Sequence, residues 1–530
     1  MLKKITSGIL TICLLASALT ACKTATTSGQ ESSAAKSSAA GSSIQDGGKI
    51  TVYSNYGGLQ NATKPSDTAY VEKMKAYIKE KTGIEVNFIA PPKDAAADKE
   101  KLNLLLSSGA EIDTFKGDIA TYATSGAIQP IGELVEKYGA NLKKLWPETW
   151  AGGWAGMKTM DGKIWGVPEL PALAGCTVYF RDDWLTKTSV AMPKTTAEMK
   201  AALIAIKAKD PAGNGQTIPL LADMRGLNMA MASGWMDVGY SWDNRGFMDA
   251  DGVYKPMVFA PGYKEFIAEM AEWYKEGLIY KESFTINKDR QLELGKTNRV
   301  ASYCMWYTTA TVPIEQIIQD GTIANVSIKV ADPLTGPKGL TKSMSDTSQT
   351  GWVVSKSSKN PEGVIKYINW VQANLTNYLT VMMGFEGDTW AYEENKPDGM
   401  SSIKKLNPDV VKYNAEFMAG SSFAYTKKFV TTSGGKIPVA NQYISNFITD
   451  NTKCKLPSTF GFSFLMNKQE IIKQVGNLED MITFLDAGTV KFIMGSRPMS
   501  EWDAFLKEIE KVGLKKWEDA YTAEYKKAKK

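Results

Sequence analysis

The N-terminal segment constrains this chain most, because it decides in which compartment the rest must fold and work. Lys3 and Lys4 precede an apolar run from Ile9 to Leu19. That run is too short to span a bilayer, and a basic stretch followed by a short apolar stretch is typical of a secretory signal peptide. The sequence therefore predicts that the protein is exported.

The apolar run ends in Leu19-Thr20-Ala21-Cys22. This tetrapeptide resembles the lipobox of bacterial lipoproteins, which implies removal of residues 1–21 and lipidation of Cys22. Residues 22–47 are rich in Ser, Ala, Thr and Gly and carry almost no large apolar side chains, so they predict a flexible linker. We expect a lipid anchor on the extracytoplasmic face of the cell membrane, of the Gram-positive type. The alternative is an ordinary secretory peptide followed by a chance cysteine.

Residues 48–530 are too many for one hydrophobic core and enough for two or three lobes. Removing residues 1–21 takes away two lysines and no acidic residue, so the formal charge falls from +5 to +3. A dedicated nucleic-acid-binding protein normally has a stronger or more clustered basic excess. No later stretch has about 18 uninterrupted apolar residues, so the sequence predicts no second membrane span.

Histidine is absent from the whole sequence. This excludes Ser-His-Asp and Cys-His catalytic groups, zinc sites with histidine ligands and the commonest general base. Three cysteines lie beyond the predicted anchor, at positions 176, 304 and 454. Their odd number and wide separation argue against a disulfide framework and favour single buried thiols.

The first part of the predicted domain has the pattern of an α/β sheet. Ile50 and Val52 indicate a short buried strand, and apolar residues from Tyr70 to Ile78 recur at helical spacing. Ile84 to Phe88 alternate as a strand, and Leu102 to Leu106 belong to a second predicted helix. Alternation of strand and helix is typical of a parallel sheet.

Ligands of such sheets lie beyond the carboxyl ends of the strands. The loops at Asn55-Tyr56 and Gly117-Asp118 follow predicted strands. They are therefore candidate ligand loops.

From residue 126 onward several segments follow one another in a characteristic order. They are DGKIWGVPEL at 161–170, VYFRDDWL at 178–185, EWYKEGLI at 272–279, GKTNRVASYCMWY at 295–307, KNPEGVIKYINWV at 359–371, GFEGDTW at 384–390 and the segment at 485–514. In this order they resemble the extracellular solute-binding proteins of family 1, in particular the lipoprotein-type members that serve carbohydrate ABC transporters. The resemblance covers nearly all of the predicted mature chain.

The resemblance implies a periplasmic binding protein-like type II fold, with two α/β lobes joined by crossover strands and a ligand cleft between them. Lobe 1 is expected at about 48–165 plus later returning segments, and lobe 2 at about 175–300 plus parts of the C-terminal half. The implied function is non-catalytic: capture of a saccharide, with an oligosaccharide expected, and delivery to ABC permease subunits with an ATPase. A monomer without cofactor is expected.

Many relatives carry a calcium loop of the D-x-N-G-N-G-x-x-D-E type, and here the matching loop runs from Asp210 to Pro219. Ala212 occupies the third position, and the acidic pair is missing. Calcium takes six to eight oxygen ligands with carboxylates among them. Calcium at Asp210 and Asn214 is therefore disfavoured.

A saccharide has a flat C–H face and a rim of hydroxyls, so its site needs aromatic platforms and a few fixed polar groups. Eight tryptophans lie beside glycines or at strand ends: Trp150, Trp154, Trp165, Trp235, Trp242, Trp306, Trp352 and Trp390. For Arg181, ion pairing with Asp182 or another neighbour is the alternative to ligand contact. The candidate ligand-binding residues are Asn55, Tyr56, Asp118, Trp165, Tyr179, Arg181, Trp235, Trp306, Trp352, Glu386, Asp388 and Trp390.

Two alternatives remain open. A secreted glycoside hydrolase needs two carboxylates and no histidine, and Glu169, Glu386 and Asp388 are available acids. A binding protein for a peptide or another non-sugar solute is the second alternative, which the loop tryptophans disfavour.

Overall fold

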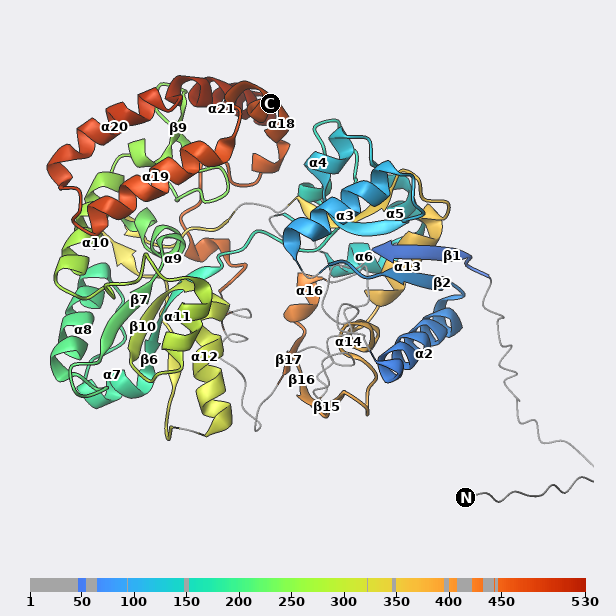
Figure 1. The fold of residues 1–530 in the computed structure, drawn as a ribbon, viewed down its shortest axis with the longest axis horizontal. Helices are drawn as coiled ribbons and strands as arrows, with labels where there is room; N and C mark the ends of the chain where they lie inside the picture. Colours follow the sequence, from blue (N-terminus) through green and yellow to red (C-terminus); the bar gives the residue numbers. More distant parts are fainter. Residues whose placement is uncertain are drawn as a thin grey trace, which may run out of the picture. The chain divides into compact units, whose positions relative to one another are not determined.

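The computed structural model describes residues 46–53, 64–92, 94–146, 152–321, 323–345, 349–394, 400–407, 422–431, 443 and 447–530. These residues belong to one compact unit, and Figure 1 follows it from β1 to α21. The predicted signal peptide, Cys22, Asn55, Tyr56 and Trp150 lie outside the described residues and stay predictions. Among the described residues, no helix combines the length and the apolar character that a membrane span requires.

A six-stranded sheet forms the centre of the first lobe. Its strand order is β2-β1-β3-β14-β4, with β5 paired to β14. β1 runs parallel to β2 and β3, whereas β14 runs antiparallel to β3, β4 and β5. The strands are β1 (Lys49–Tyr53), β2 (Glu85–Ile89), β3 (Thr114–Asp118), β4 (Ile128–Gln129), β5 (Gly166–Pro168) and β14 (Thr350–Ser355).

Helices cover this sheet, and their apolar faces form its core. Met74 and Ile78 of α2 are fully buried in the same cluster as Ile50 and Val52 of β1. Gly83 ends α2 at φ 74°, a backbone conformation that glycine adopts without steric cost. The helices are α2 (Pro65–Thr82), α3 (Ala95–Ser107), α4 (Ile119–Thr124), α5 (Gly132–Tyr138), α6 (Ala140–Leu145), α13 (Pro361–Val371) and α14 (Leu375–Met383).

A small sheet and a short helix complete the described part of the first lobe. The sheet has the order β15-β16-β17. Ile403 on its middle strand is buried in the first lobe's core cluster. The elements are β15 (Trp390–Glu394), β16 (Ser401–Lys405), β17 (Phe429–Thr431) and α16 (Phe423–Thr426).

The second lobe is built on a four-stranded sheet of order β11-β6-β10-β7. β10 pairs parallel with β7 and antiparallel with β6. The strands are β6 (Cys176–Arg181), β7 (Ile218–Ala222), β10 (Val300–Trp306) and β11 (Ile328–Val330). The helices of this lobe are α7 (Asp182–Thr188), α8 (Thr196–Lys209), α9 (Met224–Ala230), α10 (Tyr263–Lys275), α11 (Lys288–Gly295) and α12 (Tyr307–Asp320).

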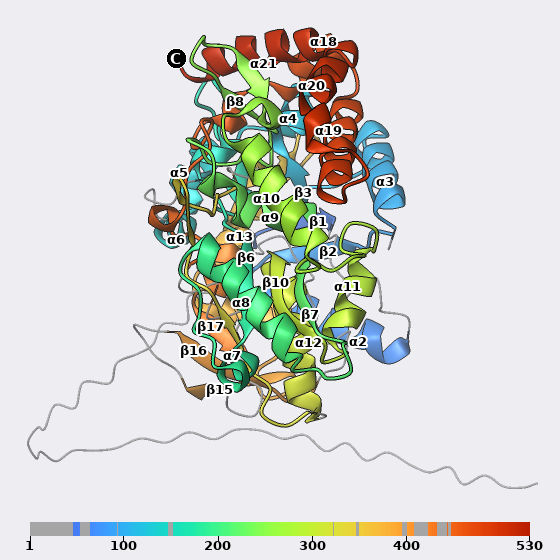
Figure 2. The same ribbon diagram turned by 90° about the vertical axis from the view of Figure 1, so that its left-hand side faces the viewer.

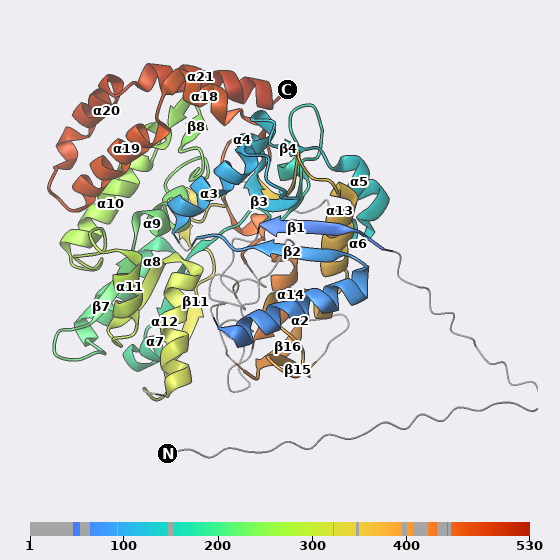
Figure 3. The same cartoon turned by 45° about the vertical axis from the view of Figure 1, so that its right-hand side comes forward.

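Two short hairpins and the C-terminal helices belong to the same lobe. Figures 2 and 3 show the red C-terminal helices against α10, and side chains of both regions share one buried cluster. The elements are β8 (Gly246–Met248), β9 (Tyr254–Pro256), β12 (Thr335–Gly336), β13 (Gly339–Leu340), α18 (Lys468–Val475), α19 (Leu478–Ile493), α20 (Trp502–Lys511) and α21 (Leu514–Ala528).

Crossover segments join the lobes between β5 and β6, between β13 and β14, and after β17. They bond to one another: the Ser345 backbone N–H donates to Leu173 O at 2.8 Å, and the Ala174 backbone N–H donates to Ile448 O at 2.8 Å. Buried Lys342 donates to the Tyr443 hydroxyl, which in turn donates to the Ala174 carbonyl. Two α/β lobes with joined crossovers confirm the predicted fold class.

Candidate ligand-binding site

A cavity of about 280 Å³ lies where the crossover segments meet both lobes. Asp118 and Thr350 line it from the first lobe, and Arg225 and Trp306 line it from the second. Crossover residues that line it include Leu173. A ligand in this cavity would contact both lobes at once.

The lining contains buried polar atoms that have no hydrogen-bond partner among the described residues. They are the Asn244 Nδ2, Ser345 Oγ, Gln349 Oε1 and Arg225 Nε atoms. Asn244 is 4% exposed and Gln349 is 8% exposed. Buried polar groups are almost always hydrogen-bonded in proteins, so a cluster of unpartnered ones beside a cavity indicates a place for a polar ligand or for water.

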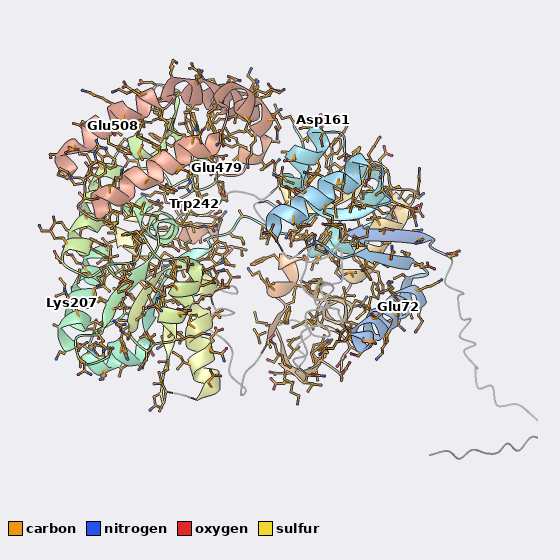
Figure 4. All side chains as sticks on the ribbon, viewed as in Figure 1. Glu72, Asp161, Lys207, Trp242, Glu479 and Glu508 are labelled. Atoms are coloured by element: carbon orange, nitrogen blue, oxygen red, sulfur yellow. The ribbon has the colours of Figure 1, made fainter. Side chains whose placement is uncertain are left out.

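An aromatic surface stands beside these polar groups. Trp306 ends β10, is half-buried and lines the cavity. The Arg225 guanidinium carbon lies 4.4 Å from the centroid of the Trp306 ring and 5.4 Å from that of Trp242. Trp242 itself belongs to the second lobe (Figure 4). The cavity thus offers an apolar ring and several hydrogen-bonding groups, which is the combination that saccharide recognition requires.

Charged groups of both signs line the cavity. Asp118 ends β3 and caps α4, because its Oδ1 accepts hydrogen bonds from the backbone N–H and the Oγ1 of Thr121, both at 2.9 Å. Asp243 and Lys468 also line it. Behind the lining, burial raises the pKa of the Asp223 carboxyl, and the nearby Arg225 charge acts in the opposite direction. The lining therefore contains acceptors for hydroxyl groups and donors for anions.

A second cavity of about 340 Å³ adjoins the first, because Gln349 and Phe464 line both. Trp165 lines this second cavity and donates its indole N–H to Thr159 Oγ1 at 2.8 Å. Met160 is 57% exposed and also lines it. Each cavity is thus lined by one tryptophan, Trp306 in the first and Trp165 in the second, and Gln349 and Phe464 form the wall that they share.

Three of the candidate residues from the sequence line a cavity. Asp118 and Trp306 line the first, and Trp165 lines the second. Sequence reasoning did not select Arg225, which lies in the first turn of α9, close after the end of β7 at Ala222. The strand-end rule, extended to the second lobe, would have pointed to this region. Sequence reasoning also did not select Asn244, Ser345, Gln349, Phe464 or Lys468, which lie in segments without a periodic pattern or at a helix start.

Five candidate residues are instead part of the protein interior, and we reassign them to packing. The rings of Tyr179, Trp352 and Trp390 are 0% exposed. Trp235 is 8% exposed and packs on Phe266, with ring centroids 5.4 Å apart. A side chain that is enclosed by its own lobe has no face left for a ligand.

Arg181 is the fifth of these residues and is 1% exposed. It forms two hydrogen bonds with the Asp183 carboxylate, at 2.7 and 2.6 Å, and a third with Asn298 Oδ1 at 2.7 Å. Its guanidinium carbon lies 4.4 Å from the Trp184 ring centroid. The structural ion pair that the sequence left open is therefore present, with Asp183 as the partner.

The remaining acidic candidates lie elsewhere. Glu386 is exposed and Asp388 is half-buried in the turn that precedes β15, and neither lines the two cavities. Glu169 is 5% exposed and forms an ion pair with Lys116 at 2.6 Å. Among the described residues, the carboxylates that line the first cavity are those of Asp118 and Asp243.

The degenerate calcium loop folds around its own first residue. Asp210 Oδ2 accepts the Gly215 N–H at 2.7 Å, and Asp210 Oδ1 accepts the Thr217 N–H at 3.1 Å and the Thr217 hydroxyl at 2.6 Å. These hydrogen bonds lower the pKa of the Asp210 carboxyl, with the Thr217 hydroxyl as the largest cause. The Asp210 carboxylate therefore stabilises a glycine-rich turn by accepting hydrogen bonds from it.

The chain is similar to carbohydrate receptors in sequence. It is 24% identical over 480 residues to a fructooligosaccharide ABC transporter substrate-binding protein, FusA, of Streptococcus pneumoniae serotype 4, covering 82% of this chain and 83% of that protein. It is 21% identical over 485 residues to the polygalacturonan/rhamnogalacturonan-binding protein YtcQ of Bacillus subtilis strain 168, covering 89% of this chain and 90% of that protein.

Solved structures show the same fold. One is an HMO-binding, ABC transporter-associated solute-binding protein from Bifidobacterium longum infantis. It matches with a TM-score of 0.64 at 15% identity, covering 90% of this chain and 98% of that one. The family model for bacterial extracellular solute-binding proteins matches residues 61–374, which is more than half of the chain. The chain therefore belongs to the bacterial extracellular solute-binding protein family.

Proposed function

We propose that this protein is a lipid-anchored extracellular receptor that captures an oligosaccharide between its lobes and delivers it to an ABC importer. The observation that carries the proposal is the cluster of unpartnered buried polar atoms beside Trp306 in the first cavity. Hydroxyl groups of a sugar can donate to Gln349 Oε1 and accept from Asn244 Nδ2, while its C–H face lies on the indole ring.

The pair of adjoining cavities favours an oligosaccharide over a single sugar. Trp306 lies in the first cavity and Trp165 in the second, and Gln349 and Phe464 separate them. A chain of two or more sugar units would place one unit on each tryptophan. The relatives whose names specify fructooligosaccharide or polygalacturonan binding support this size class.

Delivery requires that the bound form differ from the free form. A ligand shifts a conformational equilibrium only by the difference between its affinities for the two states. Because Asp118 of the first lobe and Trp306 of the second line the same cavity, a bound sugar stabilises the arrangement in which both contact it. The permease subunits and their ATPase would recognise that arrangement. We expect the receptor to act as a monomer.

The test is a binding screen with the full-length chain, purified in detergent because of the apolar N-terminal run. Tryptophan fluorescence and thermal melting would be measured against a panel of oligosaccharides. A ligand at 100 times its Kd stabilises the native state by about 2.7 kcal/mol. Binding by at least one oligosaccharide, recovered chemically unchanged, supports the proposal. No response to any saccharide, or slow cleavage of the bound sugar, contradicts it.

A matched pair of variants connects binding to the cavity. Gln349→Ala removes an unpartnered acceptor from the lining, whereas Gln474→Ala changes an exposed glutamine on α18. We expect the first to weaken binding by about 1 to 3 kcal/mol, in the range measured for groups that bind a ligand directly, and the second to leave it unchanged. Equal affinities of the two variants would show that the ligand binds elsewhere.

A further inference from the structure

The guanidinium group of Arg225 forms no ion pair within 4.0 Å with any described residue, although the buried Asp223 carboxylate behind the cavity lining is near enough to interact with its charge. Four of the six arginines of the chain form ion pairs, namely Arg181 with Asp183, Arg245 with Asp486, Arg290 with Glu293, and Arg497 with Glu508. Arg299 donates to the Gln216 backbone carbonyl at 3.1 Å. Of the six arginine side chains, all of which the structure describes, only that of Arg225 has neither an ion pair nor a hydrogen bond, and its Nε atom is buried without a partner.

The surrounding rings hold this unpaired group in place. Arg225 lies beside Trp306 and Trp242, at 4.4 and 5.4 Å from the ring centroids. Trp242 also contacts Arg245, whose guanidinium carbon lies 3.5 Å from the centroid of the Trp242 ring. Arg245 donates hydrogen bonds of 3.0 and 3.2 Å to the Asp486 carboxylate. Contact with the rings occupies the faces of the Arg225 group and leaves its N–H edge for another partner.

Arg225 lies at the wall of the first cavity. Arg225 lines the first cavity together with Lys468, so two cations face the same space. A guanidinium presents its N–H donors in a fork that matches the two oxygens of a carboxylate, and such bidentate pairs are among the strongest hydrogen bonds in proteins.

The carboxylates of the lining do not neutralise this cation. No carboxylate of a described residue lies within 4.0 Å of the Arg225 nitrogens, since no such ion pair occurs, and Asp118 directs one oxygen to Thr121. Asp118 and Asp243 are natural acceptors for sugar hydroxyls. The lining therefore fits a ligand that has hydroxyl groups and one acidic group.

We propose that the ligand is a saccharide that carries a carboxylate, and that Arg225 binds this carboxylate beside the Trp306 ring. The inference rests on the proposed function and names the chemical class of its ligand. Arg225 is then the residue that distinguishes acidic from neutral sugars.

The experiment compares matched saccharides on the full-length chain. The probes are oligosaccharides of glucuronate, galacturonate and mannuronate, sialyllactose with lactose as its neutral counterpart, carboxyl-reduced forms of the uronate chains, and a sulfated disaccharide. Binding is measured by calorimetry at low and at moderate salt. We expect at least one carboxylated sugar to bind about 10- to 100-fold more tightly than its neutral form, with weaker binding at higher salt.

Variants then assign the preference to one residue. Arg225→Gln should remove the preference for the acid while leaving weak binding of the neutral form, and Arg225→Lys should retain only part of it, because lysine cannot form the fork. Arg290→Gln removes the same charge from an exposed position and should change nothing.

The outcomes separate the inference from the proposed function. The inference is overturned if neutral sugars bind as tightly as acidic ones, or if the sulfated sugar binds and no carboxylated sugar does. In both cases the proposed function as a saccharide receptor still stands. A preference for acids that survives Arg225→Gln also overturns the inference. Failure of every saccharide to bind overturns the proposed function itself.

Discussion

Gly175 and Trp306 are in such close contact that no other residue type fits at position 175. A Cβ atom added to Gly175 would lie 2.0 Å from the Cζ3 atom of the Trp306 ring. Gly175 belongs to the first crossover and immediately precedes β6, whereas Trp306 ends β10, which pairs with β6. The crossover backbone therefore sets the position of the aromatic ring in the cavity.

Gly175→Ala is expected to weaken ligand binding because the added methyl group displaces the Trp306 ring. Trp306→Ala should weaken binding by about 1 to 3 kcal/mol, as is usual for an aromatic anchor. In the double variant the clash is absent, so its affinity should equal that of Trp306→Ala alone. Calorimetry with any ligand found in the screen measures all three. Additive losses would show that Gly175 acts independently of the ring.

Trp352→Ala is expected to affect stability where Trp306→Ala does not. Trp352 lies on β14, is 0% exposed and belongs to the core cluster of the first lobe. Truncation of a buried tryptophan costs about 3 to 5 kcal/mol through lost packing and the cavity that remains. Denaturant unfolding of both ligand-free variants makes the comparison. A Trp352→Ala protein as stable as wild type would remove Trp352 from the core.

Lys342→Met is expected to change how stability depends on pH. Burial lowers the pKa of Lys342 from 10.5 to about 8. Between these values the unfolded chain binds the proton and the native state does not, so this residue makes the free energy of unfolding rise as the pH rises from about 8 toward 10.5. Methionine fills a similar volume without a charge, and the rise should disappear.

The measurement is denaturant unfolding of wild type and Lys342→Met between about pH 7.5 and 9.5, below most tyrosine titration. Lys507→Met on the exposed face of α20 is the control and should keep the wild-type slope. The interpretation fails if wild type and Lys342→Met have parallel pH profiles.

Calcium is expected to have no effect on melting. The Asp210 oxygens already accept hydrogen bonds from Gly215 and Thr217, and Ala212 supplies no side-chain ligand. A hard cation needs more oxygen ligands than this loop offers. Thermal melts in calcium and in EDTA should coincide, whereas Asp210→Ala should lower the melting temperature in both. A melt that shifts with calcium would show that the loop binds metal.

The local pattern of the sequence determined much of the first lobe. Period-2 and helical spacing of apolar residues predicted β1 and α2, and Gly83 marked the end of that helix. These features depend on residues close in sequence, because each side chain's direction follows from the backbone period. The strand-end rule likewise selected Asp118, which the structure places on the cavity lining.

Sequence could not separate the tryptophans that pack from those that line a cavity. Trp306 and Trp352 each occur on a strand, yet one lines the cavity and the other is enclosed. The difference arises from long-range pairing: β14 lies inside its sheet between β3 and its other partners, whereas Trp306 is the last residue of β10. Which neighbours a strand acquires is a property of the whole fold.

The sequence by itself thus determined the alternation of strands and helices and the absence of histidine chemistry. It also predicted export and the family resemblance. Only the tertiary structure decided that Arg225, Asn244, Ser345 and Gln349 meet around one cavity. These residues are separated by up to more than a hundred positions, and none belongs to a shared local pattern. Their unpartnered polar atoms become visible only when every other atom that could satisfy them has been placed.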